Sequence, residues 1–155
     1  MYLKLFISIL IPLAVGGISG IFTTAEIPTW YAQLNKPWFN PPSWIFAPVW
    51  TSLYVLMGIA MFLVWKSNAP EPQKKMALYV YAIQLVLNFF WSIIFFHFHQ
   101  TGWALVEIGF MWVFILLTIF AFGKINSTAA WLLVPYICWV SFATVLNHAI
   151  WKLNQ

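Results

Sequence analysis

Charged residues are scarce in this chain of 155 residues, which has seven lysines, three glutamates and no arginine, for a net charge of +4. Hydrophobic residues make up 63% of the sequence, and the mean hydropathy is +0.86. A soluble domain of this composition would have too little polar surface to cover its core. The lysines are scattered among short turns and form no basic stripe, so we expect no nucleic-acid partner. The composition predicts an integral membrane protein.

The residues that carry common enzyme chemistry are also rare. Cysteine occurs once, at Cys138, so the chain can form no internal disulfide. The sequence has no Ser/His/Asp set, no metal-binding cysteine cluster and no glycine-rich phosphate loop with lysine. His97 and His99 are two residues apart and would point away from each other on a helix. We therefore expect no metal site and no ordinary hydrolytic or nucleotide chemistry.

Long intervals without any charge divide the chain into apolar segments. A helix needs about 20 apolar residues to cross a bilayer. Barrel strands would alternate polar and apolar residues, whereas these segments are apolar all round. We therefore predict an all-α bundle of five transmembrane helices, forming a single domain over residues 1–155. The predicted spans are residues 3–24, 43–65, 76–96, 103–122 and 128–151.

The lysines also predict an orientation. With five spans, one side of the membrane has Lys4, Lys66, Lys74, Lys75 and Lys124, and the other has Lys36 and Lys152. The positive-inside rule then places the N-terminus in the cytoplasm. No organelle-targeting segment is visible, so we expect a bacterial cell membrane.

The predicted connection between the first two spans, residues 25–42, contains four prolines and four large aromatic residues. Connections this long are usually functional or disordered, and disordered segments are poor in aromatic residues. Trp30, Tyr31, Trp38 and Phe39 need apolar surface to pack on. We predict a folded cap over one mouth of the bundle. The alternative is an interfacial segment whose rings rest among lipid headgroups.

Eleven tryptophans are present, and four of them lie in the middle of apolar runs instead of at the membrane interface where tryptophan is usual. Trp50, Trp91, Trp112 and Trp139 are these four, and we interpret them as walls of an internal binding site. Three spans place hydrogen-bonding groups on the same helix face as large rings. These stripes are Trp50, Tyr54 and Gly58; Gln84, Asn88, Trp91 and Phe95; and Tyr136, Trp139, Ala143 and Asn147.

Polar side chains inside the hydrocarbon layer must find partners, so the three stripes should face the bundle interior. One interpretation is interhelical hydrogen bonding, at about 0.6 kcal/mol for each bond. The other is a pocket with aromatic walls and a few placed polar groups, suited to a flat, poorly soluble ligand.

On the first span, Gly16 and Gly20 form a G-x-x-x-G pattern, which lets helices approach each other closely. The close approach is either within the bundle or between two copies of the chain. We expect a homodimer.

Several segments resemble the translocator protein family, whose bacterial members are called tryptophan-rich sensory proteins and whose mitochondrial members are called peripheral benzodiazepine receptors. The resemblance rests on residues 30–42, WYAQLNKPWFNPP, and residues 46–58, FAPVWTSLYVLMG. Residues 87–96, 102–107 and 135–147 also match, in the same order. The resemblance covers essentially the whole chain.

The resemblance implies a five-helix membrane protein, often dimeric, that needs no cofactor. Its ligands would be porphyrins such as protoporphyrin IX, haem, and synthetic isoquinoline carboxamides or benzodiazepines. The implied pocket residues are Tyr31, Pro41, Trp50, Tyr54, Asn88, Trp91, Ser92, Trp139, Ala143 and Asn147. Cholesterol is left in doubt as a partner, because residues 145–152 lack the tyrosine of the family's C-terminal cholesterol motif.

Three functions remain open at this point. The first is a receptor or sensor that captures a porphyrin, with residues 25–42 as a lid. The second, which the resemblance also implies, is an enzyme that degrades porphyrins in light and oxygen, with Trp50 and Trp139 exchanging an electron with the excited pigment. The third is a transporter of porphyrins or lipids, although the chain shows no internal repeat and no paired broken helices.

Overall fold

The computed structural model describes residues 1–155, and it consists of helices and their connections without any strand. The α-helices are α1 (Tyr2–Glu26), α2 (Phe46–Trp65), α3 (Glu71–Ser92), α4 (Thr101–Gly123), α5 (Ser127–Leu132) and α6 (Val134–Leu153). Three short helices accompany them: the π-helices η1 (Ile27–Tyr31) and η3 (Ile93–His97) and the 3-10 helix η2 (Ser43–Ile45). Five helical segments are long and apolar enough to cross a membrane, which confirms the predicted five-helix membrane bundle.

Two predicted span boundaries differ from the structure because prolines, and not hydropathy, set them. The third span begins at Glu71 instead of residue 76, since Pro72 occupies the first turn, where its missing N–H removes no bond within the helix. The fifth span is divided at Leu133 into α5 and α6, because Pro135 has no N–H to donate to the preceding turn.

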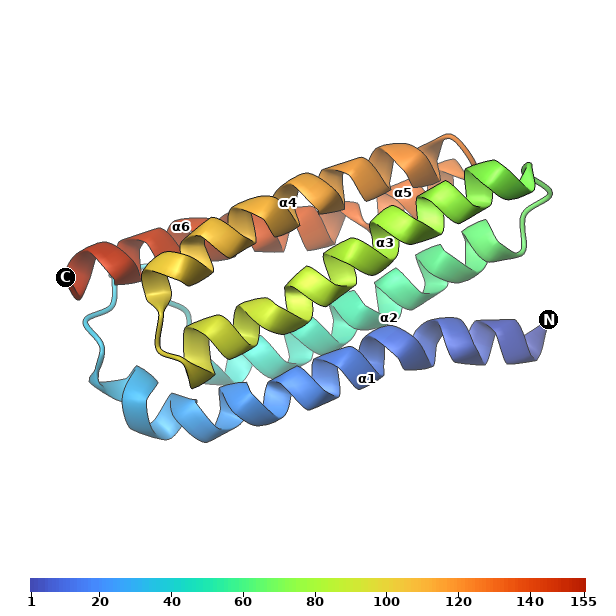
Figure 1. The fold of residues 1–155 in the computed structure, drawn as a ribbon. Helices are drawn as coiled ribbons and strands as arrows, with labels where there is room; N and C mark the ends of the chain where they lie inside the picture. The colour runs from blue at the N-terminus through green and yellow to red at the C-terminus, as the bar shows by residue number, and fades with distance from the viewer.

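The segment 25–42, predicted as one connecting loop, is helical in its first half. The helix α1 continues through η1, and irregular chain begins only after Gln33. Pro28 lies in the first turn of η1, so it shifts the hydrogen-bonding pattern without ending the helix. Both π-helices lie at the end of the bundle that also holds the C-terminus (Figure 1). Such π-helical turns are frequent at functional sites.

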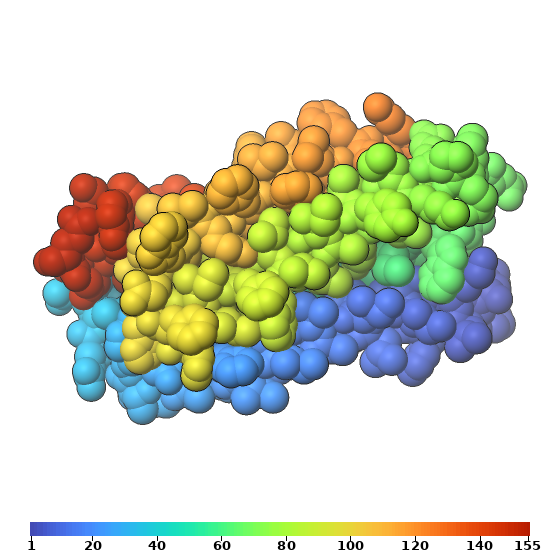
Figure 2. All heavy atoms as spheres, viewed as in Figure 1, coloured from blue at the N-terminus to red at the C-terminus, as the bar shows by residue number.

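The bundle is built from helix pairs. Along its length α1 packs on α2, α3 on α4, and α4 on α6, while α1 also contacts α3 (Figure 1). In the space-filling view, α3 crosses the middle of one face between α1 and α4 (Figure 2). The centre of the bundle is filled by the buried Met57, Met111, Ile115, Tyr136 and Val140. Phe6, Phe110 and Phe120 are among the large apolar side chains that point outward, as a lipid-covered surface requires.

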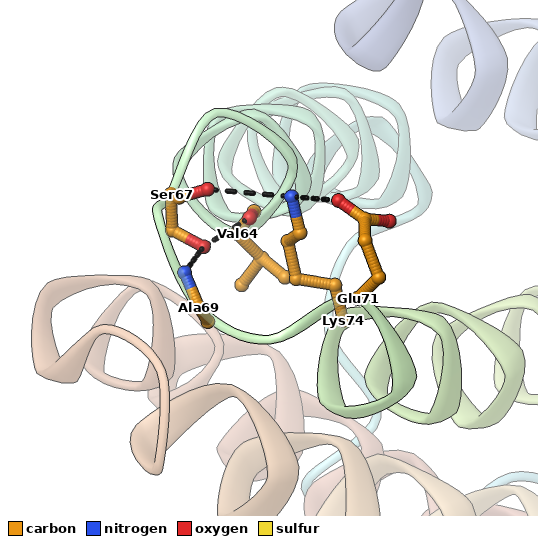
Figure 3. A network of polar contacts seen from close by, with 5 residues as sticks. All are labelled: Val64, Ser67, Ala69, Glu71 and Lys74. Atoms are coloured by element: carbon orange, nitrogen blue, oxygen red, sulfur yellow. Dashed lines mark hydrogen bonds and ion pairs between the residues drawn. The ribbon is translucent and has the colours of Figure 1, made fainter.

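The end of the bundle near the N-terminus has a short turn between α2 and α3, which local polar contacts stabilise (Figure 3). The Ser67 hydroxyl donates to the Val64 carbonyl at 2.8 Å and accepts from the Ala69 N–H at 3.4 Å. The Lys74 ammonium donates to the Ser67 carbonyl at 3.4 Å and pairs with Glu71 at 2.6 Å. These local contacts hold the connection between α2 and α3 in a compact turn.

Candidate ligand-binding site

A cavity of about 300 Å³ lies between α1, α2 and the end of α3. Its α1 wall includes four small residues, Gly16, Gly17, Ser19 and Gly20, beside Leu13, Thr23 and Thr24. The other walls carry large rings: Phe46, Trp50, Tyr54, Trp91 and Phe96. Exposed lining residues, including Gly17, Thr24 and Thr51, place the opening on the outer surface between α1 and α2.

The glycines of α1 create this cavity in two different ways. A Cβ atom on Gly16 would overlap the Tyr54 ring, so the absence of a side chain there lets Tyr54 pack directly on α1. A Cβ atom on Gly17 or Gly20 would meet nothing within 4 Å, so these two positions face open space. The G-x-x-x-G pattern therefore provides helix packing at Gly16 and cavity volume at Gly20.

The ring wall on α2 is formed by Trp50 and Tyr54, which lie one turn apart. Their rings are stacked, with centroids 5.7 Å apart and planes inclined by 27°. The Tyr54 hydroxyl donates to Asn88 Oδ1 on α3 at 2.6 Å. That hydrogen bond fixes the Tyr54 ring between α1 and α3, so this wall of the cavity is held in place before any ligand arrives.

Asn88 belongs to a buried polar network that joins three helices. Its Nδ2 donates to the Tyr136 hydroxyl on α6 at 2.8 Å, and that hydroxyl donates to Gln84 Oε1 at 2.8 Å. Asn88, Tyr136 and Gln84 are each no more than 2% exposed. Hydrogen bonds of this kind contribute about 0.6 kcal/mol each in membrane proteins. Asn88 and Gln84 thus act mainly as connections between helices, as the first interpretation of the stripes predicts.

A second cavity of only about 30 Å³ lies between Tyr31, α3 and α6. Its lining includes Trp91, Ala143 and Asn147, and it shares Phe46, Trp91 and Phe96 with the larger cavity. Trp91 is held by a hydrogen bond from its Nε1 to Asn147 Oδ1 at 3.1 Å. Asn147 in turn donates from Nδ2 to the Thr101 carbonyl at 2.9 Å. Asn147 therefore orients Trp91 and joins α6 to the start of α4.

The segment between α1 and α2 folds back over this end of the bundle. Tyr31 is buried and donates its hydroxyl hydrogen bond to Asn40 Oδ1 at 2.8 Å. Trp30 stacks on His99 with centroids 4.2 Å apart and planes inclined by 9°, and His99 Nε2 lies 3.0 Å from Glu26 Oε2. These contacts tie the end of α1 to the turn between α3 and α4, which also explains why His99 tolerates a φ of 57°.

Two features of this cap were not predicted. Asn35 and Asn154 exchange hydrogen bonds of 2.9 Å that join the loop to the end of α6. The prediction that Trp38 packs on the bundle was wrong, because Trp38 is 95% exposed and has an edge contact with Phe39 alone among the rings. An exposed tryptophan at a loop tip is typical of the membrane interface, and for Trp38 the interfacial alternative stays a prediction.

The residues that sequence reasoning selected fall into three groups. Trp50, Tyr54, Trp91 and Ser92 line the larger cavity. Tyr31, Trp91, Ala143 and Asn147 line the smaller one. Pro41, Asn88 and Trp139 line neither, and Trp139 instead packs on Phe46 and Phe142. Reasoning from the sequence missed Phe46, Phe96 and the α1 residues as cavity walls, although the cluster of small residues on α1 was a usable signal.

Two further side chains, Trp112 and Glu107, lie away from the larger cavity. Trp112 was interpreted as a wall, but its Nε1 donates to the Ser141 hydroxyl at 2.8 Å and ties α4 to α6, away from the larger cavity. Both carboxyl oxygens of Glu107 on α4 are buried and have no hydrogen-bond partner. No three histidine, cysteine or acidic side chains lie close enough together to hold a metal ion.

The fold and the site define a class of protein: a five-helix integral membrane protein with an aromatic-walled cavity that opens on its side. Residues 8–152 match the TspO/MBR family, and the chain belongs to that family. The tryptophan-rich protein TspO of Chlorobaculum tepidum is 43% identical over 92% of this chain and 90% of its own length. The translocator protein of Bos taurus is 38% identical over 94% of this chain and 87% of its own length. The tryptophan-rich sensory protein of Cereibacter sphaeroides is 42% identical over 81% of this chain and 77% of its own length.

Proposed function

We propose that this protein is a membrane receptor that binds a porphyrin, such as protoporphyrin IX or haem, in the cavity between α1 and α2. The observation that carries the proposal is the pairing of two unlike walls. Stacked rings of Trp50 and Tyr54 face the bare backbone at Gly17 and Gly20. A flat ring system can stack on the first wall while its edge approaches the second.

The cavity also has the general properties of a small-molecule site. Its volume of about 300 Å³ lies at the lower end of the usual range of about 300 to 1,000 Å³, and its apolar walls carry few polar groups. The polar groups that do line it toward the cap are the hydroxyls of Thr23, Thr24 and Ser43. Porphyrin carboxylates would lie at this wetter end. The name of the Cereibacter sphaeroides relative, tryptophan-rich sensory protein, agrees with a receptor role.

Titration of the purified protein in detergent micelles with protoporphyrin IX tests the proposal. Saturable quenching of tryptophan emission at micromolar porphyrin is expected, above the quenching seen with free tryptophan in empty micelles. Trp50→Phe should weaken binding by about tenfold because one stacking surface is reduced. Trp38→Phe is the matched control, since Trp38 is exposed and lies outside the cavity. Emission that stays unchanged in the wild type would remove the proposal.

A second proposed function is the breakdown of the bound porphyrin in light and oxygen. The specific observation in its favour is that Trp50, a cavity wall, stacks on Tyr54, whose hydroxyl begins the hydrogen-bonded chain through Asn88 to Tyr136. An excited porphyrin could take an electron from the Trp50 indole, and the cavity would hold the radical pair away from water. Trp139 would take part after a change in its surroundings, because it does not line the larger cavity.

Illumination of the complex in air separates the receptor from the enzyme. If the protein is an enzyme, porphyrin absorbance falls faster with wild-type protein than with Trp50→Phe or Trp139→Phe at equal occupancy. Equal rates in all three proteins would exclude these indoles from the chemistry and leave the receptor function in place.

We further propose that the protein resides in a bacterial-type cell membrane with its N-terminus in the cytoplasm. Five lysines support this orientation. The start of α1, the turn from α2 to α3 with the first residues of α3, and the end of α4 all lie at the end of the bundle that holds the N-terminus (Figure 1). These segments contain Lys4, Lys66, Lys74, Lys75 and Lys124. Labelling of cysteines introduced at Ser67 and Asn35 with a membrane-impermeant maleimide in intact cells tests the orientation. Only the Asn35→Cys protein should react from outside, and the reverse pattern would contradict it.

A further inference from the structure

The hydroxyl groups on the α1 side of the larger cavity already donate their protons to the helix itself. The Thr24 hydroxyl donates to the Gly20 carbonyl at 2.8 Å, and the Thr23 hydroxyl donates to the Ser19 carbonyl at 3.4 Å. The Ser19 hydroxyl donates to the Gly16 carbonyl at 3.2 Å. A hydroxyl group has one proton and two lone pairs. With the proton bonded to a backbone carbonyl, each of these groups offers a ligand only its lone pairs.

Two hydroxyl groups on α2 are committed in the same way. The Thr51 hydroxyl donates to the Ala47 carbonyl, one turn earlier, at 2.7 Å. The Tyr54 hydroxyl donates to Asn88 Oδ1 at 2.6 Å. Thr51 and Tyr54 also line the larger cavity, so their protons are no more available to a ligand than those of the α1 hydroxyls.

Hydroxyl groups that can donate to a ligand lie on a different side of the cavity. Ser43 in the 3-10 helix η2 and Ser92 at the end of α3 both line it, and neither hydroxyl has a hydrogen bond within the protein. The backbone N–H groups of α1 at this wall are used within the helix. The α1 side therefore offers a ligand hydrogen-bond acceptors alone.

No cation lines the larger cavity to attract a negatively charged ligand group. Lys36 in the cap loop donates to the Leu34 carbonyl at 3.1 Å and lies 4.9 Å from the centroid of the Tyr31 ring. Lys152 at the end of α6 lies 5.3 Å from the centroid of the Trp151 ring. An ionised carboxylate that leaves water without a cation to pair with is strongly unfavourable. A carboxylate placed against α1 would therefore meet neither a counter-ion nor a free donor.

We propose that Ser19, Thr23 and Thr24 determine which ligand edge the cavity accepts against α1, namely an uncharged edge with N–H or O–H groups of its own. A porphyrin carboxyl group that contacts this wall does so as a neutral acid, and an amide group is the better match. This inference rests on the proposed porphyrin-binding function and adds the chemistry of the bound edge to it.

Two uncharged derivatives of one porphyrin test the selection, because the ring that stacks on the aromatic wall is the same in both. Protoporphyrin IX diamide has N–H donors at its edge, whereas protoporphyrin IX dimethyl ester has acceptors only. The wild type in detergent micelles should bind the diamide about tenfold more tightly than the ester, as two added hydrogen bonds in a membrane interior would give. Quenching of tryptophan emission measures both affinities.

Removal of the hydroxyl groups should abolish this preference. The double variant Thr23→Val/Thr24→Val replaces each hydroxyl by a methyl group and leaves the backbone hydrogen bonds of α1 in place. Its affinities for the diamide and the ester should be equal within about twofold, and Thr24→Val alone should lower the wild-type ratio by about threefold. Thr29→Val is the matched control. The Thr29 hydroxyl donates to the Ala25 carbonyl at 3.3 Å in the same manner, but Thr29 does not line the cavity.

The possible failures are distinguishable from one another. If the wild type binds the ester as tightly as the diamide, or if Thr24→Val and the double variant keep the wild-type ratio, the α1 hydroxyls do not select the ligand edge and the receptor function stands. If the wild type binds neither derivative nor protoporphyrin IX, the proposed function itself falls. Unfolding midpoints in the same detergent show that each ratio belongs to folded protein, and Thr24→Val decides the question if the double variant does not fold.

Discussion

Trp50 in α2 and Trp112 in α4 are the same residue type in two transmembrane helices, yet they have opposite roles. Trp50 faces the small residues of α1 and lines an open cavity. Trp112 meets Ser141 on α6, donates its indole hydrogen bond at 2.8 Å and closes the interface between α4 and α6. The difference arises from the facing helix and not from the tryptophan.

The two sides of the bundle differ in how densely side chains fill them, and only one side leaves a cavity of about 300 Å³. On the α4 and α6 side, fully buried Met111, Ile115 and Val140 fill the interior. On the α1 and α2 side, glycines at positions 17 and 20 leave space that no neighbouring side chain occupies. A deep tryptophan becomes a cavity wall only where the opposite backbone lacks side chains and its indole N–H is not used between helices.

The largest expected effect on stability comes from disrupting the close contact between α1 and α2 at Gly58. Gly58 on α2 touches α1 so closely that an added Cβ would lie 2.5 Å from the Ile9 Cα and 2.7 Å from the Ser8 carbonyl oxygen. Backbone atoms cannot move aside easily, so Gly58→Ala should reduce the free energy of unfolding by about 1 to 3 kcal/mol. Unfolding in mixed micelles with increasing SDS, followed by circular dichroism, measures the change. Gly109→Ala on α4, with nothing within 4 Å of its added Cβ, should cause no loss.

A larger side chain in the cavity should make the α1 and α2 side of the bundle as densely packed as the α4 and α6 side. Gly20→Leu places a side chain in the cavity without a clash, since nothing lies within 4 Å of its Cβ. We expect protoporphyrin IX affinity to fall by at least about tenfold, equivalent to about 1.4 kcal/mol, while the unfolding midpoint stays near that of the wild type. Gly109→Leu is the matched control. Unchanged porphyrin affinity in Gly20→Leu would show that the ligand binds elsewhere.

The third change releases the ring wall from its support. Asn88→Ala removes the acceptor of the Tyr54 hydroxyl and the donor to Tyr136. At about 0.6 kcal/mol for each bond, stability should fall by about 1 kcal/mol. Porphyrin affinity should fall as well, because Tyr54 loses its fixed orientation. A stability loss with fully retained affinity would mean that the ring wall does not need this support.

The smallest effect is expected for Trp112→Phe, which tests directly whether Trp112 and Trp50 differ in role. Trp112→Phe removes the hydrogen bond to Ser141, and stability should fall by only about 0.6 kcal/mol. Porphyrin affinity should remain unchanged, in contrast with Trp50→Phe. Equilibrium titration of both variants with protoporphyrin IX measures the two affinities. A loss of affinity in Trp112→Phe would place Trp112 in the binding site.

The fold could be predicted from the sequence because the bilayer restricts the alternatives. Charge-free intervals between lysines and glutamates set the number of spans, and apolar surface all round excludes barrel strands. Local backbone chemistry could not be predicted in the same way. Pro28 would normally end a helix, but here the chain adopts a π-helical turn and continues, so that the first half of segment 25–42 is helical.

The candidate site was only partly predictable, because spacing along one helix says nothing about which helices face each other. Trp50 and Tyr54 could be placed on one face by their interval of four residues. The position of α1 opposite them could not, and so Gly17, Gly20 and Phe46 were missed as cavity walls. The same limit explains Trp112, whose partner, Ser141, lies on a helix that the sequence could not place.

Trp50 and Trp91 line the larger cavity, and Trp112 does not. Fluorine NMR of protein labelled with 5-fluorotryptophan tests directly whether a porphyrin binds in this cavity. Single Trp→Phe variants assign each resonance, and protoporphyrin IX is then added to the labelled wild type in detergent. We predict that the Trp50 and Trp91 resonances shift or broaden saturably while the Trp112 resonance stays in place. A shift at Trp112 with Trp50 unchanged would contradict the account.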